Sequence, residues 1–333
     1  MITRLSNAFS ASLLALACAF PAAAHAHHLT EWTYIDLGVL RPGGQSFAIA
    51  VNNAGDVAGY AEAPRTGAID TAGVLWRNGA LQDIGAPAGS SGVAVNDINE
   101  DGRIVGVTME GQAVTWKDGT WSFLGFNGSA KAIGCSGDIA GTTVVGGHER
   151  GVLLRDGVLT DLGTLGGLAT LVNAMNDRGH VVGRSSLADG RSHAFLWANG
   201  RMRDLGTIGR MDSVATAINN HDAIVGFALD KASHVTAFVW FGRLYRLLPG
   251  FTDVFPFAIN DLDDIVGRIE SENVAFLAAD GELVRLDELA AVRASGFTGL
   301  LPRGINERRW IVGTALGSGG EHGFILMPKT TTP

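Results

Sequence analysis

Four histidines of this chain could bind a metal ion if the fold gathered them around one point: His148, His193, His234 and His322. All four fall in segments that we expect to be loops between short strands, and His193 and His322 hold the same position of a repeated segment. The sequence contains no close-spaced ligand pair of the His-x-x-x-His kind. Because repeat equivalence alone predicts recurring structural residues, we favour histidines that bond loop backbone in their own repeat. We therefore predict no metal site, no cofactor and no catalytic residue.

Acidic and basic side chains share these expected loops, and a glycosidase would need two of the acids to face each other. The acids are Glu62, Asp70, Glu110, Glu149, Asp189, Asp212, Asp230, Asp253, Glu270, Glu272 and Glu321. The bases are Arg41, Arg65, Arg150, Arg184, Arg191, Arg210 and Arg268. A solvated loop surface explains the same mixture. Three of the arginines join the four histidines as candidate ligand-binding residues: Arg184, Arg210 and Arg268.

One short phrase recurs seven times, and it predicts the elements that position these residues. Its copy at residues 175–183 reads Met-Asn-Asp-Arg-Gly-His-Val-Val-Gly, and in every copy the last Gly follows the Asn position by seven residues. The Asn position is occupied by Asn52, Asn99, Gly134, Asn176, Asn219, Asn260 and Asn306. The copies are 47, 35, 42, 43, 41 and 46 residues apart. A repeat of about 40–45 residues made of short strands is typical of a β-propeller blade.

The best-preserved unit, residues 161–203, predicts four antiparallel strands, which we name A to D. Strand A (172–175) precedes an Asn-Asp-Arg-Gly turn, in which Asn and Asp bond their own backbone and Gly accepts a positive φ. Strand B (180–183) follows, then strand C (193–197) and strand D (201–206). Strand A is rich in small residues, which suit the crowded axis. Four tryptophans share one place on strand C, and we interpret them as core between blades: Trp76, Trp116, Trp197 and Trp240.

The two ends of the repeated region predict how the fold is completed. The last unit stops after a strand of type C at residues 324–328, whereas the chain opens with a strand of type D at residues 32–38. The N-terminal strand should therefore complete the last blade, which would bury two strand edges. We predict an all-β protein, a single seven-bladed β-propeller of four-stranded antiparallel blades that spans residues 32–328.

Antiparallel strands place the connections at two ends. The A–B and C–D turns are short and similar in every unit, whereas the B–C and D–A loops at the other end vary in length and charge. Variable loops on a rigid scaffold are where binding usually occurs. We therefore expect the ligand on the end that carries the B–C and D–A loops.

A recurring aspartate on strand D invites a chemical interpretation. It is present as Asp36, Asp83, Asp161 and Asp204, but Phe123, Arg246 and Arg285 replace it in other units. A ring of ligands would not tolerate those replacements. We predict a structural aspartate that bonds loop backbone.

The same unit resembles the secreted bacterial proteins known as "probable extracellular repeat, HAF family". The resemblance rests on His193-Ala194-Phe195 and on the Asp-Leu-Gly-Thr segments that begin at Asp161 and Asp204. It covers roughly residues 34–327 and weakens in the third unit, which has Gly134 for Asn and Leu154 for Trp. The resemblance implies a secreted bacterial protein; it implies no agreed activity and no catalytic residues.

The first 26 residues are typical of a secretory signal. Arg4 supplies the positive charge, an apolar run follows, and Ala24-His25-Ala26 is a small-x-small cleavage site. Acylation of Cys18 is the alternative. We predict cleavage after Ala26, an extension at 27–31, a C-terminal tail at 329–333, and a periplasmic or extracellular location. Only Cys135 then remains, so no internal disulfide can form.

Composition narrows the function. The mature chain would carry 24 basic and 33 acidic residues, a net charge of −9, which argues against nucleic acid as a partner. No later apolar run is long enough to span a bilayer. We predict a monomeric binding module for a glycan, a peptide or a cell-surface protein. The alternatives are a carbohydrate-active hydrolase or lyase that uses loop carboxylates or histidines, and a repeat domain with only a structural role.

Overall fold

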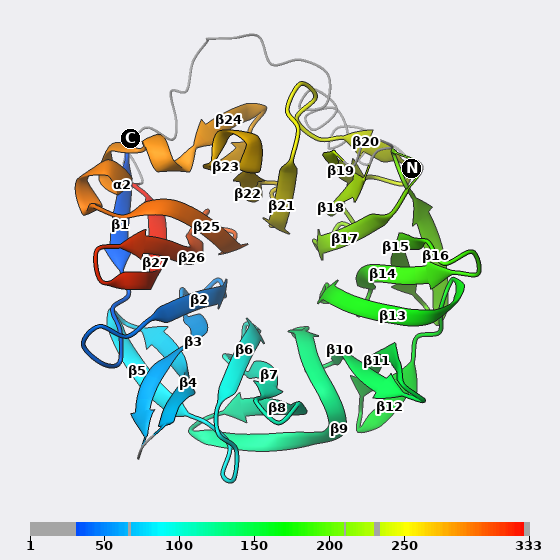
Figure 1. Ribbon diagram of the computed structural model, residues 1–333, viewed down its shortest axis with the longest axis horizontal. Helices are drawn as coiled ribbons and strands as arrows, with labels where there is room; N and C mark the ends of the chain where they lie inside the picture. Colours follow the sequence, from blue (N-terminus) through cyan, green and yellow to red (C-terminus); the bar gives the residue numbers. More distant parts are fainter. Residues whose placement is uncertain (1–30, 66–67, 210, 230–233, 330–333) are drawn as a thin grey trace, which may run out of the picture.

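The computed structural model describes residues 31–65, 68–209, 211–229 and 234–329, and this part of the chain consists mainly of short antiparallel strands. The strands form six sheets that stand around a common central axis (Figure 1). No sheet among the described residues closes on itself. The predicted all-β class is confirmed.

Five of the sheets have four strands each, in antiparallel order, as the repeat predicts. Four of them run A to D along the chain: β2 (Ser46–Val51), β3 (Val57–Arg65), β4 (Ala68–Arg77) and β5 (Ala80–Gly85); β13 (Gly166–Met175), β14 (Val181–Leu187), β15 (Ser192–Ala198) and β16 (Arg201–Gly206); β17 (Ser213–Ile218), β18 (Ile224–Leu229), β19 (Val235–Trp240) and β20 (Leu244–Arg246); β21 (Val254–Ile259), β22 (Ile265–Ile269), β23 (Val274–Ala279) and β24 (Glu282–Arg285).

The fifth four-stranded sheet joins the two ends of the described chain. Its order is β1 (Trp32–Asp36), β27 (Gly320–Pro328), β26 (Ile311–Gly317) and β25 (Thr298–Ile305). In this sheet, β1 pairs antiparallel with β27, from Trp32 opposite Pro328 to Asp36 opposite Phe324. The strand of type D at the N-terminus thus lies where the sequence predicts it.

The sixth sheet departs from the prediction because it has seven strands. They are β12 (Val158–Asp161), β11 (His148–Arg155), β10 (Ile139–Val145), β9 (Thr120–Ile133), β8 (Gln112–Lys117), β7 (Ile104–Thr108) and β6 (Val93–Ile98). The start of β9 pairs with β8 and its end pairs with β10, so one strand serves as D of one unit and A of the next. Phe123 stands where other units have the aspartate that turns the chain after strand D. Without that turn, the strand continues.

The repeated Asn builds the A–B turn and also bonds the neighbouring turn. The Asn176 side-chain oxygen accepts the main-chain N–H groups of Arg178 (3.1 Å) and His180 (3.0 Å). Its amide nitrogen donates to the main-chain oxygen of Asn219 in the next unit, at 3.0 Å. The same link to the next turn recurs from Asn52, Asn99, Asn219, Asn260 and Asn306. Buried main-chain carbonyls at these turns are thereby satisfied.

The last Gly of the phrase is required by a close approach of two strands. A Cβ atom on Gly183 would lie 2.0 Å from the main-chain oxygen of Leu171 on the adjacent strand A. No side chain fits at that distance. The Gly therefore allows strands A and B to pair where strand A bulges, and a register shift between Val172 and Ala174 marks that bulge.

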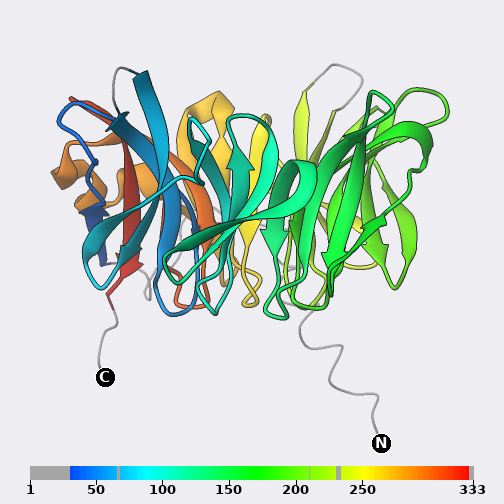
Figure 2. The same cartoon turned by 90° about the horizontal axis from the view of Figure 1, so that it is seen from below.

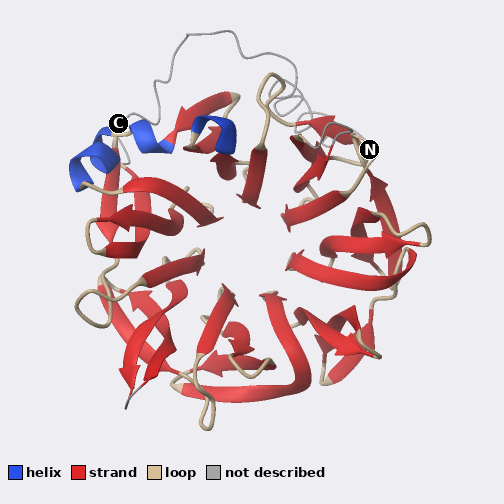
Figure 3. Cartoon of the chain, in the orientation of Figure 1, coloured by secondary structure: helices blue, strands red, loops and turns tan. Residues whose placement is uncertain are grey.

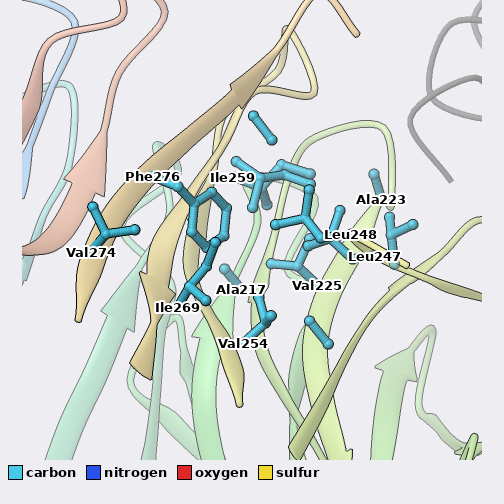
Figure 4. Packing of buried hydrophobic residues seen from close by; sticks show 14 residues of the cluster. Ala217, Ala223, Val225, Leu247, Leu248, Val254, Ile259, Ile269, Val274 and Phe276 are labelled. Atoms are coloured by element: carbon cyan, nitrogen blue, oxygen red, sulfur yellow. The ribbon is translucent and has the colours of Figure 1, made fainter. Parts of the chain in front are cut away.

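Hydrophobic side chains fill the spaces between neighbouring sheets. One cluster joins β18 and β19 to β21–β23 and includes Val225, Val254 and the fully buried Phe276 (Figure 4). Trp116, Trp197 and Trp240 are only 7–8% exposed and belong to clusters of the same kind. Trp76 packs against another cluster. These contacts match the interpretation of the tryptophans as core.

Within the described residues, helical segments lie in one part of the molecule, next to β23–β25 (Figure 3). They are η1 (Glu270–Glu272), η2 (Leu286–Glu288) and α2 (Ala290–Ser295). The sequence analysis did not predict them; η2 and α2 fill the D–A connection of the last unit. Within the described residues, no helix has the length and apolar composition that crossing a bilayer requires.

Candidate functional site

The two ends of the molecule carry different connections, as the side view shows (Figure 2). We call the end with the B–C and D–A connections the loop face and the end with the A–B and C–D turns the turn face. The candidate residues predicted from the sequence belong to the loop face. Their partners show what each one does.

Two of the four histidines are held by an aspartate of their own sheet. His193 is 8% exposed, and its Nδ1 lies 3.0 Å from the carboxylate of Asp204. His322 contacts Asp36 in the same way, at 3.0–3.1 Å. The partner is thus the recurring aspartate of strand D, not the loop backbone that we expected. The pairing joins strands C and D within one sheet.

Other units use different residues at the same two positions. Arg150 replaces the histidine and contacts Asp161 at 2.9 Å. In another unit, Arg246 replaces the aspartate and donates to the hydroxyl of Thr236 at 3.1 Å. In these four units the two positions form a brace between strands C and D.

The remaining histidines lie apart on the surface. His148 begins β11 and His234 precedes β19, and both are exposed. Within the described residues, no three His, Cys, Asp or Glu side chains are grouped so that they could hold a metal ion.

The three candidate arginines differ in how exposed their side chains are to a ligand. Arg268 is 8% exposed; it donates to the main-chain oxygen of Leu300 at 2.8 Å, contacts the Asn273 side chain and lies 3.1 Å from Glu270. It therefore ties β22 to β25. Arg184 is exposed on β14, opposite Leu171 of strand A. Arg210 lies outside the described residues.

Several acids of the loop face also brace the backbone. Glu110 accepts the Oγ–H and N–H of Ser91 at 2.7 and 2.9 Å, and these bonds lower the pKa of its carboxyl to about 2. Asp212 accepts the N–H of Ser192 at 2.7 Å, and Asp253 accepts that of Val235 at 3.2 Å. Glu62 pairs with Arg41. These carboxylates order the loops and do not converge on a common point.

The recurring aspartate of strand D behaves as predicted. It accepts the N–H of the Gly two positions later at 2.7–2.9 Å, in Asp36, Asp83, Asp161 and Asp204. That Gly has a positive φ in all four units. The aspartate therefore turns the chain out of strand D.

The loop face also exposes apolar side chains, which the sequence analysis missed. Of ten large hydrophobic side chains that are exposed among the described residues, six lie on this face: Met109, Val144, Val145, Leu168, Met211 and Leu316. Val144 and Leu168 are each 63% exposed. Val144 lies near the end of β10, and Leu168 lies near the start of β13. In the sequence, only their place in the expected loops could have identified these apolar residues as exposed.

A central cavity is the second feature that the sequence analysis missed. Each strand A has a register shift, and the residue at the shift lies three positions before the Asn of the turn. These residues are Ile49, Asn96, Lys131, Asn173, Thr216, Phe257 and Arg303, and all seven line a cavity of about 230 Å³. We call it the central channel. A bulge often aims a side chain at a functional site.

The polar bulge residues link neighbouring strands A. Asn96 donates to the main-chain oxygen of Ala130 at 2.6 Å, and Asn173 donates to that of Ala215 at 2.8 Å. Thr216 donates to the main-chain oxygen of Pro256 at 2.8 Å. These bonds fix the channel wall.

Three charged side chains line the channel. The carboxylate of Asp97 accepts the N–H groups of Ile98 (2.8 Å) and Ile133 (2.9 Å), yet burial raises its pKa to about 7. Burial lowers the pKa of the Lys131 ammonium. The Arg303 guanidinium lies 5.6 Å from the centre of the Phe257 ring, where it makes a cation–π contact.

The turn face carries a belt of side chains around the same axis. The residue after each Asn accepts the main-chain N–H of the equivalent residue in the preceding turn, as Asp177 does from Cys135 (2.8 Å) and Asp261 from Asn220 (2.7 Å). Four members of the belt are acids, which we call the acidic rim: Glu100, Asp177, Asp261 and Glu307. Burial and the nearby acids raise the pKa of Glu307. The turn face is therefore negative around the axis.

Comparison with known proteins gives the fold and no more. No protein-family profile matches the chain, and no characterised protein matches it in sequence. Solved structures do match: the β-propeller domain of the Trilobed protease from Pyrococcus furiosus has a TM-score of 0.58 and 10% identity over 86% of this chain and 94% of that one. Oligogalacturonate lyase from Vibrio parahaemolyticus has a TM-score of 0.55 and 10% identity over 91% and 98%.

A third similar structure is YCF48 bound to D1 peptide, with a TM-score of 0.54 and 13% identity over 94% of this chain and 100% of that one. Identities this low carry no residue roles from one protein to another. What they share with this chain is the arrangement of four-stranded sheets around an axis, so the chain has the fold of a β-propeller.

Proposed function

We propose that this protein is a secreted seven-bladed β-propeller that binds a protein or peptide partner through its loop face. The observation that carries the proposal is that six of the ten exposed large hydrophobic side chains among the described residues lie on that face, including Met109, Val144, Leu168 and Met211. Monomeric proteins rarely expose contiguous apolar surface unless it binds something. A glycan offers hydroxyl groups to such a surface, whereas a polypeptide offers apolar side chains.

The count of seven blades treats the seven-stranded sheet as two blades that share β9. Seven Asn-type turns support it, because each turn belongs to one strand A. The amide of Asn306 bonds the main-chain oxygen of Asn52 at 2.9 Å, so the last turn adjoins the first. The pairing of β1 with β27 supplies the fourth strand of the last blade.

The proposal that the protein is secreted rests on residues 1–26, which lie outside the described residues. Their charge, apolar run and small-x-small site support export and cleavage after Ala26. The resemblance to the HAF repeat proteins agrees with the same location. The fold suits an exported protein without disulfides, because large clusters between the sheets hold it together.

The enzyme alternative has less support. Three acids of the loop face accept main-chain N–H groups and so order the loops: Glu110, Asp212 and Asp253. The likeness to oligogalacturonate lyase is one of fold at 10% identity. We therefore assign no catalytic residue to this chain.

The test compares two surface variants that differ only in the face they alter. Leu168→Asp places a charge on the loop face, and Leu262→Asp places one on the turn face, where Leu262 is 53% exposed. Each protein, with a photo-crosslinker, is presented to the native envelope fraction. We expect the crosslinked partners of the wild type to be lost, by about tenfold or more, in Leu168→Asp alone.

A partner that crosslinks equally to all three proteins would refute the loop face as the binding surface. Turnover of a saccharide by the purified protein, unchanged in Leu168→Asp, would instead support the enzyme alternative.

A further inference from the structure

We propose that the central channel is an anion pocket of the loop face and that it takes the carboxylate of an acidic peptide segment of the partner. The inference rests on the proposed function, because it names the chemistry of the ligand that the loop face binds. Lys131 and Arg303 are the residues that would hold the carboxylate.

The two cations reach the same cavity from different sides. Lys131 lies at the bulge of β9 and Arg303 at the bulge of β25, and both line the central channel. In Figure 1, β9 and β25 face each other across the central opening. A group in the channel would therefore meet positive charge on two sides.

Neither cation forms an ion pair with Asp97, the third charged residue of the channel, because the Asp97 carboxylate accepts two main-chain N–H groups instead. Most other buried or half-buried cations have a carboxylate, such as Arg77 with Asp56 (2.5 Å) and Arg309 with Asp264 (2.8 Å). Lys131 and Arg303 have no ion pair among the described residues. Lys131 is half-buried, so its ammonium has lost water and gained no anion, which is unfavourable, whereas Arg303 is exposed at the channel. A bound carboxylate would remove that penalty.

The surroundings of Lys131 agree with this account. Burial lowers the pKa of its ammonium, and no neighbouring carboxylate raises it again. The neighbours Asn96 and Asn173 are already committed to the carbonyls of Ala130 and Ala215. They hold the channel wall in place, and the two cations supply the recognition of charge.

Aromatic residues lie on the strands A between the channel residues and the loop face. Phe47 and Phe255 stand two positions before the bulge residues of their strands. Phe47 stacks on Tyr60 at 4.9 Å, and Phe255 contacts Phe227 edge-on at 5.1 Å. Burial raises the pKa of Tyr60, and the positive charge of Arg303 opposes that rise.

The two ends of the channel thus differ, and the difference sets the direction of entry. The turn face presents the acidic rim, which repels an anion. The loop face presents aromatic and apolar side chains, which suit the apolar neighbours of an acidic residue in a peptide. An acidic saccharide has the same carboxylate but lacks those neighbours, so we favour the peptide.

The test uses acetyl-Phe-Glu-Phe-amide, its Gln counterpart and trigalacturonate as probes of the whole protein. Binding is followed by the NMR signal of the Lys131 side chain, assigned with Lys131→Met, and by calorimetry. We expect the Glu peptide to shift that signal and to bind about tenfold or more tightly than the Gln peptide.

The variants Lys131→Met and Arg303→Met should each weaken the Glu peptide by about tenfold or more, whereas Lys329→Met should leave its affinity unchanged. Lys329 is the matched control because it lies at the end of the chain and pairs with Glu31 at 3.1 Å. If either channel variant fails to fold, the comparison of the Glu and Gln peptides on the wild type still decides the proposal.

Equal affinities for the Glu and Gln peptides would overturn the anion pocket. Lys131-dependent binding of trigalacturonate alone would overturn the peptide and leave an acidic sugar as the ligand. Failure of the loop-face proposal can be told apart from failure of the anion pocket. In that case Leu168→Asp would still capture the partner, while the Lys131 signal would still shift with the Glu peptide.

Discussion

The side-chain amide of Asn306 donates a hydrogen bond to the main-chain oxygen of Asn52 at 2.9 Å, although 254 positions separate the two residues. Asn52 in turn bonds the main-chain oxygen of Asn99, and Asn99 bonds that of Gly134. The buried asparagines therefore couple one turn to the next around the axis. Stability of the turn face should depend on each link.

Loss of one link should destabilise the protein measurably. Asn306→Ala leaves the Asn52 carbonyl without its donor and also removes the acceptor for the N–H groups of Arg308 and Trp310. We expect a loss of about 2–3 kcal/mol in the free energy of unfolding, measured with denaturant. Gln112→Ala, at an exposed position of β8, is the control and should change it by less than about 0.5 kcal/mol. Equal effects of the two variants would contradict the role of the link.

The unit that lacks the asparagine offers the opposite test. A Cβ on Gly134 would lie 3.6 Å from the main-chain oxygen of Asn176, so an amide there can reach the carbonyl that now lacks this donor. We expect Gly134→Asn to stabilise the protein by about 0.5–1.5 kcal/mol more than Gly134→Ala. Gly134→Ala controls for the loss of chain entropy. No difference between their melting curves would show that the seventh link adds nothing.

Cys135 should react slowly although it is exposed. The pKa of the thiol is raised to about 12. Partial burial is the largest cause, and the hydrogen bond to Asp177 is the second. Each pKa unit lowers the thiolate fraction tenfold, so labelling at pH 8 should be about 1000-fold slower than for an ordinary thiol. Unfolded protein is the control and should react at the normal rate. A fast reaction in the native state would mean that the Asp177 bond is absent.

The carboxyl of Asp97 should make stability depend on pH. Its pKa is about 7 in the folded chain and 3.8 as a model group, so folding favours the protonated form. The contribution is fully present below about pH 4 and is lost as the pH rises through 7. Relative to wild type, Asp97→Asn should therefore gain stability between pH 5 and pH 8.5, on the order of 1–2 kcal/mol once solvent in the channel is allowed for. If the free energies of unfolding of the two proteins changed with pH in the same way, the raised pKa of Asp97 would be contradicted.

The sequence predicted the parts of the fold that repeat. Asn176 and Gly183 have chemical reasons to recur, a turn and a close approach, and both reasons are visible in the spacing. The shared strand β9 was not predicted, because Phe123 is only one substitution in a strand that is otherwise ordinary. The short helix α2 was missed because six residues give little periodic signal.

The site was harder to predict than the fold. His193 and Arg268 looked available in the sequence, but their partners Asp204 and Leu300 come from other strands. Lys131 gave no such signal, since a bulge reverses the alternation that tells an inward residue from an outward one. One pattern did exist in the sequence. The residue three positions before each repeated Asn varies in size and charge, from Ile49 to Arg303, whereas the residues around it are small.

The continuous strand β9 also has a mechanical consequence. Elsewhere around the axis a loop or a short helical segment forms the joint between strand D of one unit and strand A of the next. Between the units that share β9 no such joint exists, and their backbone amides should exchange with solvent as one cooperative group. A ligand held between Lys131 and Arg303 would therefore touch, on the side of β9, a wall that moves as one unit across two repeats.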